Sequence, residues 1–130
     1  MQAVHDFLKR VGTYYIASVD GTQPRVRPFG TINLFENRLY IQTGKKKDFA
    51  RQITANPKIE LCAFDGETWL RVAATLVEDS RPEAQESLLA AYPILHSMYA
   101  VGDGNNVVYY LKDATAVFST FGGAPRKEIF

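Results

Sequence analysis

Tight turn signals between strand-like segments constrain the fold of this sequence more than any other feature. Asp20-Gly21 follows a segment rich in Tyr, Ile and Val, and Asp65-Gly66 stands between two further strand-like segments. Such dipeptides supply the positive φ angles of a tight β-hairpin. Hairpins join antiparallel strands, whereas parallel strands need helical crossovers. The turns therefore predict an antiparallel sheet that closes into a small barrel.

Alternation of apolar and polar residues between these turns predicts six strands. They cover residues 13–19, 25–35, 39–43, 58–64, 68–78 and 107–121. Pro24 and Pro28 confine part of the second strand to a sheet edge or a bulge, because proline cannot donate to a sheet ladder. Cys62 lies in the apolar run of the fourth strand, and we expect it to be a small buried hydrophobe.

Three helices are expected at the periphery of the barrel. The first two cover residues 3–11 and 45–56. Ser80-Arg81-Pro82-Glu83 has the spacing of a capping box and is expected to open the third helix, which runs through Leu88 and Leu89. Pro93 breaks that helix, and we expect a short helical turn from there to Tyr99.

Size and charge narrow the possible functions. The 130 residues are expected to form one domain, residues 1–130, and the net charge of +1 provides no broad basic field for nucleic acid. No apolar run approaches the roughly 18 residues of a membrane span, and the first residues do not resemble a secretory signal. We therefore expect a cytoplasmic protein that binds neither nucleic acid nor membrane.

Three consecutive lysines, Lys45 to Lys47, stand where the second helix is expected to begin. A helix N-terminus carries about half a positive charge, so each cation in its first turn is disfavoured by roughly 0.3–1 kcal/mol. A bound anion would offset this cost, and free backbone N–H groups at a helix start suit phosphate. The segment therefore predicts a phosphate site. The alternative is a solvated charge run at a helix end.

A second cationic group lies on the second expected strand. The period of two places Arg25, Arg27 and Phe29 on one face, with Val26 and Pro28 on the other. Arginine donates in pairs to phosphate or carbonyl oxygens and stacks on rings, so this face suits a planar anionic ligand. The alternative is a pair of solvated arginines on an edge strand.

The motifs of other nucleotide and metal sites are missing from the chain. No G-x-G-x-x-G follows the first strand and no G-x-x-x-x-G-K-[ST] is present, so neither a dinucleotide fold nor a P-loop is supported. His5 and His96 lie far apart and belong to no H-x-x-x-H or C-x-x-C pattern, so we expect no metal site. The sequence singles out no catalytic residue.

Taken together and in order, five segments resemble the FMN-binding split-barrel proteins of the pyridoxamine 5'-phosphate oxidase-like superfamily. They are Arg25–Phe29, Leu39–Thr43, Lys47–Ile53, Asn56–Cys62 and Trp69–Val72. The resemblance spans roughly residues 10 to 121. It implies a mainly β fold, a six-stranded antiparallel FMN-binding split barrel with peripheral helices, that works as a homodimer with FMN at the interface.

The resemblance also implies where FMN would lie. Arg25, Val26, Arg27 and Pro28 would flank the ring system and ribityl chain, and Gln42, Thr43, Lys46 and Lys47 would meet the tail and the phosphate. Trp69 could pack the barrel, but we expect it to stack near the flavin of the partner subunit and count it among the cofactor-binding residues.

A flavoprotein of this kind is expected to pass electrons from NADH or NADPH through FMN to a small oxidised acceptor. The alternatives are a flavin-binding carrier or sensor without turnover, or the same barrel with haem or a deazaflavin. Pyridoxamine 5'-phosphate oxidases proper carry an Arg-x-His substrate motif that Arg126–Phe130 lacks, so the resemblance does not extend to that activity. The closer likeness is to short general-stress or nitroreductase-like flavoproteins.

The expected homodimer also rests on the pattern of one strand. Residues 68–78 carry apolar side chains on both faces, yet a small barrel has one interior. An outward apolar row needs a cover, and a second copy of the same chain provides it through a two-fold contact.

Overall fold

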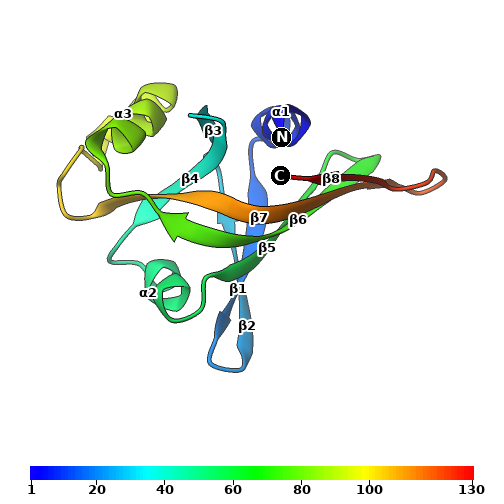
Figure 1. The fold of residues 1–130 in the computed structure, drawn as a ribbon, viewed down its shortest axis with the longest axis horizontal. Helices are drawn as coiled ribbons and strands as arrows, with labels where there is room; N and C mark the ends of the chain where they lie inside the picture. Colours follow the sequence, from blue (N-terminus) through cyan, green and yellow to red (C-terminus); the bar gives the residue numbers. More distant parts are fainter.

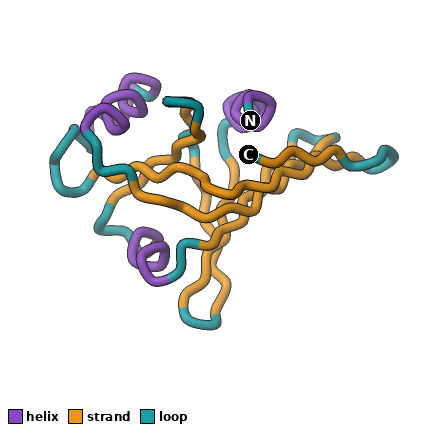
Figure 2. Tube along the Cα trace, in the orientation of Figure 1, coloured by secondary structure: helices purple, strands orange, loops and turns teal.

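Antiparallel strands are the main regular structure of the fold, with helices around them (Figures 1 and 2). A computed structural model describes residues 1–130. Its helices are α1 (Gln2–Val11), α2 (Asp48–Ala55), α3 (Pro82–Ala91) and the 3-10 helix η1 (Pro93–Ser97). Its strands are β1 (Tyr14–Asp20), β2 (Gln23–Phe29), β3 (Asn33–Phe35), β4 (Arg38–Gly44), β5 (Lys58–Phe64), β6 (Thr68–Glu78), β7 (Asn106–Thr120) and β8 (Arg126–Ile129). None of the helices is long and apolar enough to cross a membrane.

All strand pairs are antiparallel, and the predicted hairpins are confirmed. β1 pairs with β2, β3 with β4 and β5 with β6, each across a short turn. Gly21 and Gly66 take positive φ angles of 63° and 104° in two of these turns. Glu36 and Asn37 take the left-handed conformation in the third, at 48° and 59°. The prediction of a mainly antiparallel β fold with peripheral helices is therefore correct.

Strand order brings the two edges of the sheet together. The strands run β2-β1-β5-β6-β7-β4-β3, with β8 attached to β7, so β2 and β3 lie at opposite ends of the series. Only Gly30, Thr31 and Ile32 connect them. A link of this length spans at most about 14 Å, so the sheet must curl until its edges meet. We call the line along which they meet the seam.

The number of strands is eight, not the expected six. The segment expected as one strand over residues 25–35 divides into β2 and β3, because its halves pair with different neighbours. β8 was not expected at all. Its polar residues show no apolar alternation, and it is a strand only because it pairs with β7.

Two helix starts also differ from the expectation. Lys45 and Lys46 precede α2, and Lys47 is its N-cap residue with an extended backbone, so the lysines do not occupy the first helical turn. The capping box is wrong as well, because the N-cap of α3 is Arg81 and not Ser80. Asp79 accepts a hydrogen bond from the Arg81 amide at 3.1 Å and binds its guanidinium group.

The main hydrophobic core fills the space inside the curled sheet. Its fully buried side chains include Ile16, Leu61 and Leu70, which come from three neighbouring strands. The alternation predicted for β5 is confirmed, with Ile59, Leu61 and Ala63 buried. Cys62 points the other way and is exposed, so its expected burial is wrong. The period of two places it on the outer face with Lys58 and Glu60.

Candidate functional site

A cleft of about 430 Å³ lies along the seam of the sheet, where β2 leads into β3. This volume is within the range of small-molecule sites, about 300–1,000 Å³. Its walls come from the end of β2, the link to β3, the end of β4, α2 and the η1 region. The lining residues are Arg27, Pro28, Phe29, Gly30, Thr31, Gln42, Thr43, Lys47, Phe49, Tyr92, Ile94, Leu95, Met98 and Tyr99.

A second, more polar hollow adjoins the cleft, and the two share Arg27, Lys47 and Phe49. Its lining residues are Asp20, Arg25, Val26, Arg27, Lys47, Asp48, Phe49 and Gln52. Since both share the same two cations, an extended ligand in the cleft can reach the hollow past Arg27 and Lys47.

One end of the cleft has the donors of an anion site. Lys47 is exposed and forms no ion pair within the protein. No side chain caps α2, so the N–H groups of its first turn are free of intrahelical partners. Thr43 is 4% exposed, and its hydroxyl group takes part in none of the side-chain hydrogen bonds within the protein. These groups together can bind a phosphate.

The other two lysines are engaged elsewhere. The Nζ atom of Lys45 lies 3.5 Å from Glu78. The backbone amide of Lys46 donates to Asn105 Oδ1 at 3.2 Å, and Lys46 does not line the cleft. Of the three lysines, Lys47 is therefore the one placed to meet a ligand there.

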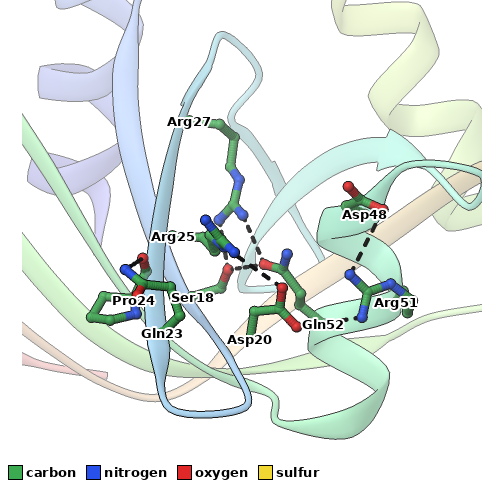
Figure 3. A network of polar contacts seen from close by, with 9 residues as sticks. All are labelled: Ser18, Asp20, Gln23, Pro24, Arg25, Arg27, Asp48, Arg51 and Gln52. Atoms are coloured by element: carbon green, nitrogen blue, oxygen red, sulfur yellow. Dashed lines mark hydrogen bonds and ion pairs between the residues drawn. The ribbon is translucent and has the colours of Figure 1, made fainter.

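Arg27 is held at the boundary between cleft and hollow by neutral acceptors (Figure 3). Its Nη1 donates to the Ile16 carbonyl at 3.1 Å and to Ser18 Oγ at 2.7 Å. Its Nη2 donates to Gln52 Oε1 at 2.8 Å, and the guanidinium lies 4.7 Å from the centre of the Phe49 ring. Partial burial lowers the pKa of Arg27. An arginine nonetheless stays charged at neutral pH, so this is a fixed cation.

The neighbouring arginines, in contrast, are compensated by carboxylates (Figure 3). Asp20 lies 3.6 Å from Arg25 and 3.5 Å from Arg51, and Asp48 lies 3.7 Å from Arg51. Two carboxylates thus offset two arginines. The surplus positive charge of the cleft and hollow resides on Arg27 and Lys47.

The opposite wall of the cleft is apolar. Ile94 and Met98, in and just after η1, line it although 80% and 66% exposed. Tyr92 anchors this wall to the seam, because its hydroxyl accepts from the Ile32 amide at 2.9 Å and donates to the Ile32 carbonyl at 3.0 Å. A side chain at Gly44 would place its Cβ 3.0 Å from the Tyr99 hydroxyl, so glycine permits this close approach.

Most residues predicted from the sequence gather at this site. Arg27, Pro28, Gln42, Thr43 and Lys47 line the cleft, and Arg25 and Val26 line the adjoining hollow. The side-chain N–H groups of Gln42 already donate to the Thr43 carbonyl and to Asn106 Oδ1. Lys46 and Trp69 line neither space. Trp69 lies instead at the start of β6, with its ring centroid 5.0 Å from that of Phe121.

Several site residues were missed, each for a physical reason. Ser18 and Gln52 meet Arg27 from separate elements, and nothing in the sequence pairs them. Phe49 was not among the predicted site residues, yet it lines the cleft as well as packing in the core. The η1 residues were expected as a short helical turn without a role in the site. Their apolar side chains at a proline-led turn were the available signal.

The two histidines lie outside the cleft. His5 contacts Asp6 at 2.9 Å on α1, and His96 lies in η1 without lining the cleft. No group of three or more His, Cys, Asp or Glu side chains is arranged to hold a metal ion.

Comparison with known proteins identifies what this architecture is similar to. Residues 1–118 match the family model described as pyridoxamine 5'-phosphate oxidase. A NimC/NimA family protein from Clostridium acetobutylicum is 34% identical, with a TM-score of 0.96 over 100% of this chain and 92% of the other. The chain matches none of the curated proteins.

Two more distant structures share the fold. A pyridoxamine 5'-phosphate oxidase-related, FMN-binding protein from Nostoc punctiforme is 15% identical, with a TM-score of 0.66 over 99% of this chain and 95% of the other. A heme-binding protein from Mycobacterium smegmatis is 11% identical, with a TM-score of 0.74 over 98% of this chain and 57% of the other.

Proposed function

Because this chain belongs to the pyridoxamine 5'-phosphate oxidase family, we propose that it is a flavoprotein that binds FMN in the cleft at the seam. The observation that carries the proposal is a pair of cations without acidic partners, Arg27 and Lys47, which line the same cleft beside the Thr43 hydroxyl. An apolar wall opposite two cations suits a ligand with a flat ring system and an anionic tail.

The phosphate would lie at the start of α2. Lys47 supplies a positive charge there, the first-turn amides supply N–H donors, and the Thr43 hydroxyl supplies one more. Charge-assisted contacts of this kind are about twice as strong as neutral ones. Lys46 would contribute through longer-range attraction, since it does not line the cleft.

The ring system would lie along the end of β2. Arg25, Val26, Arg27 and Pro28 provide that surface, and Arg27 is the cation nearest to any charge that develops on the ring. FMN supplies the electron-transfer chemistry when bound, and the protein orients it and sets the surrounding charge. The backbone near Val26 is a further donor for the ring carbonyl.

We propose an oxidoreductase that takes electrons from NADH or NADPH and passes them through FMN to a small oxidised acceptor. The rival is a flavin carrier or sensor without turnover. Both are tested by the absorption spectrum of the purified protein. Flavin bands would support FMN or riboflavin, and bleaching of those bands by NADH or NADPH would favour the enzyme over the carrier.

The same spectrum separates other cofactors. Heme binding by one structural neighbour makes haem a second candidate, and an intense Soret band would support it. The cleft lining contains no histidine, which favours flavin over haem in this proposal. A deazaflavin would be recognised by bands at shorter wavelength than those of FMN.

We also propose a homodimer in which Trp69 belongs to the contact between subunits. Trp69 lies on the outer row of β6 and packs with Phe121, while Phe64 and Phe121 are 52% and 81% exposed. These three neighbouring aromatic side chains form an exposed apolar patch, and such a patch favours association with another protein surface. Ala73 is exposed on the same outer row. It is the position at which a charge should disturb the contact most directly.

A further inference from the structure

Arg27 differs from the other arginines around the hollow in the acceptors that hold it. Arg25 and Arg51 contact carboxylates, whereas Arg27 contacts Ser18 and Gln52 (Figure 3). Arg27 also donates to the Ile16 carbonyl. All three are neutral. The guanidinium is therefore oriented at several points with no carboxylate in contact with it, and the attraction of Asp48 acts on it only from a longer distance.

Gln52 is central to this arrangement. It is 4% exposed, and its Oε1 accepts from Arg27 Nη2 at 2.8 Å and from Ser18 Oγ at 2.5 Å. Ser18, which is 3% exposed, gives its single hydroxyl hydrogen to Gln52 and accepts from Arg27 Nη1. The three side chains form a closed triangle in which each hydrogen has one acceptor.

A carboxylate at position 52 would fit the same space but would change the charge. It would form an ion pair with Arg27 in a partly buried setting, where such pairs are strong. The amide of Gln52 therefore orients Arg27 without neutralising it. Two N–H groups of the guanidinium fork, Nε–H and one on Nη2, are free of partners within the protein and can donate to a ligand.

We propose that Gln52, supported by Ser18, is the positioning residue that fixes Arg27 as an uncompensated cation in the cleft, so that the site favours a ligand that gains negative charge next to Arg27. For a flavin, this inference rests on the proposed function. Reduction adds electron density to the ring system, and a fixed cation beside it stabilises the reduced form relative to the oxidised form. Gln52 would thereby raise the reduction potential without contacting the flavin.

The test compares Gln52→Glu, which adds a carboxylate against Arg27, with Gln52→Met, which keeps the volume but removes the acceptor. Gln23→Glu is the matched control. Gln23 is exposed at the start of β2, away from the cleft, contacts only the Pro24 carbonyl through its side chain, and gives the same change in net charge. Ser18→Ala provides a second way to loosen Arg27 if a substitution at Gln52 prevents folding.

The first measurement needs no ligand. In NMR spectra of the flavin-free protein, the guanidinium signals of Arg27 should be resolved and slowly exchanging in the wild type, since three acceptors hold it. They should average in Gln52→Met and in Ser18→Ala. Signals as well resolved in both variants as in the wild type would overturn the positioning role.

The second measurement is the midpoint potential of bound FMN. Gln52→Glu should weaken the preference for reduced over oxidised flavin by tenfold or more, a shift of about 30 mV to more negative potential for a two-electron couple. Gln23→Glu should shift it much less. Equal shifts in the two variants would show an effect of net charge alone and would overturn the inference. A wild-type protein that binds no flavin would refute the proposed function, and the NMR measurement would then decide the positioning role by itself.

Discussion

Replacement of Lys47 by alanine tests the phosphate end of the cleft most directly. Lys47 is exposed, is paired with no carboxylate and lies at the N-cap of α2, so its removal breaks no ion pair and opens no cavity. The change should therefore act on ligand binding and leave the fold intact. FMN and riboflavin differ by the phosphate, so Lys47→Ala should lower the affinity for FMN and leave the affinity for riboflavin unchanged.

The expected loss of FMN affinity follows from the contact that is removed and from those that remain. A hydrogen bond to a charged group contributes about 1.5–3 kcal/mol, and the exposure of Lys47 favours the lower end. Since about 1.4 kcal/mol corresponds to a tenfold change in affinity, Lys47→Ala should weaken FMN binding roughly tenfold. The Thr43 hydroxyl and the free amides of α2 should retain part of the phosphate affinity. Removal of a cation from a helix N-terminus should also raise the unfolding free energy of the flavin-free protein, by roughly 0.3 kcal/mol.

The assay is titration of the flavin-free protein with FMN and with riboflavin at one ionic strength, because exposed charges are screened by salt. Lys58→Ala, at an exposed position at the start of β5, is the control for the change in net charge. The loss of FMN affinity in Lys46→Ala should lie between the losses in Lys47→Ala and Lys58→Ala, because Lys46 lies near the cleft but does not line it. If Lys47→Ala keeps the full wild-type preference for FMN over riboflavin, the phosphate is not bound at α2.

Three further predictions address the ring surface, the dimer and the ion pairs. Arg27→Ala should shift the potential of bound flavin to more negative values while the preference for FMN over riboflavin stays, and an unchanged potential and affinity would exclude Arg27 from the ring surface. Ala73→Asp should halve the mass found by sedimentation at micromolar concentration and release flavin, whereas a wild-type monomer that holds FMN tightly would refute the proposed interface. Hydrogen bonds from Arg81 lower the pKa of Asp79 to about 2, against the opposing effect of burial. This stabilisation is present above the unfolded pKa of about 4 and is lost as pH falls toward 2, so Asp79→Asn should lower the unfolding free energy at pH 7 by about 2 kcal/mol and flatten its acid dependence in urea titrations.

The sequence predicts those elements whose pattern is local. β5 and β6 have the expected bounds, because alternation and Asp65-Gly66 mark both strands and their turn. The sequence does not show that β2 and β3 are two strands. The break at Gly30–Ile32 arises because β2 pairs with β1 and β3 pairs with β4, at opposite ends of the sheet. β8 is likewise defined by its partner β7.

For the site too, the sequence predicts residues that a local property marks and misses those that only the folded arrangement brings together. Lys47 was found because the charge of a helix N-terminus is a local property, although the lysines proved to precede the helix. Gln52 and Ser18 were missed because an ordinary polar residue gains its role only when folding brings it to Arg27. Ile94 and Met98 were missed because their exposure in a cleft wall depends on where η1 packs.

The short link across the seam has a consequence for the kinetics and thermodynamics of binding. Gly30, Thr31 and Ile32 tether the two edges of the sheet, and Thr31 is held further, since its hydroxyl accepts from the Gln42 amide at 3.0 Å and its carbonyl accepts from Tyr14. Two sheet edges joined by so short a tether cannot separate far, and Tyr92 bonds the η1 wall to Ile32 of the same tether, so the cleft exists at nearly its working width before any ligand arrives. Little conformational entropy is then lost on binding, and association should proceed in a single phase without a slow closing step.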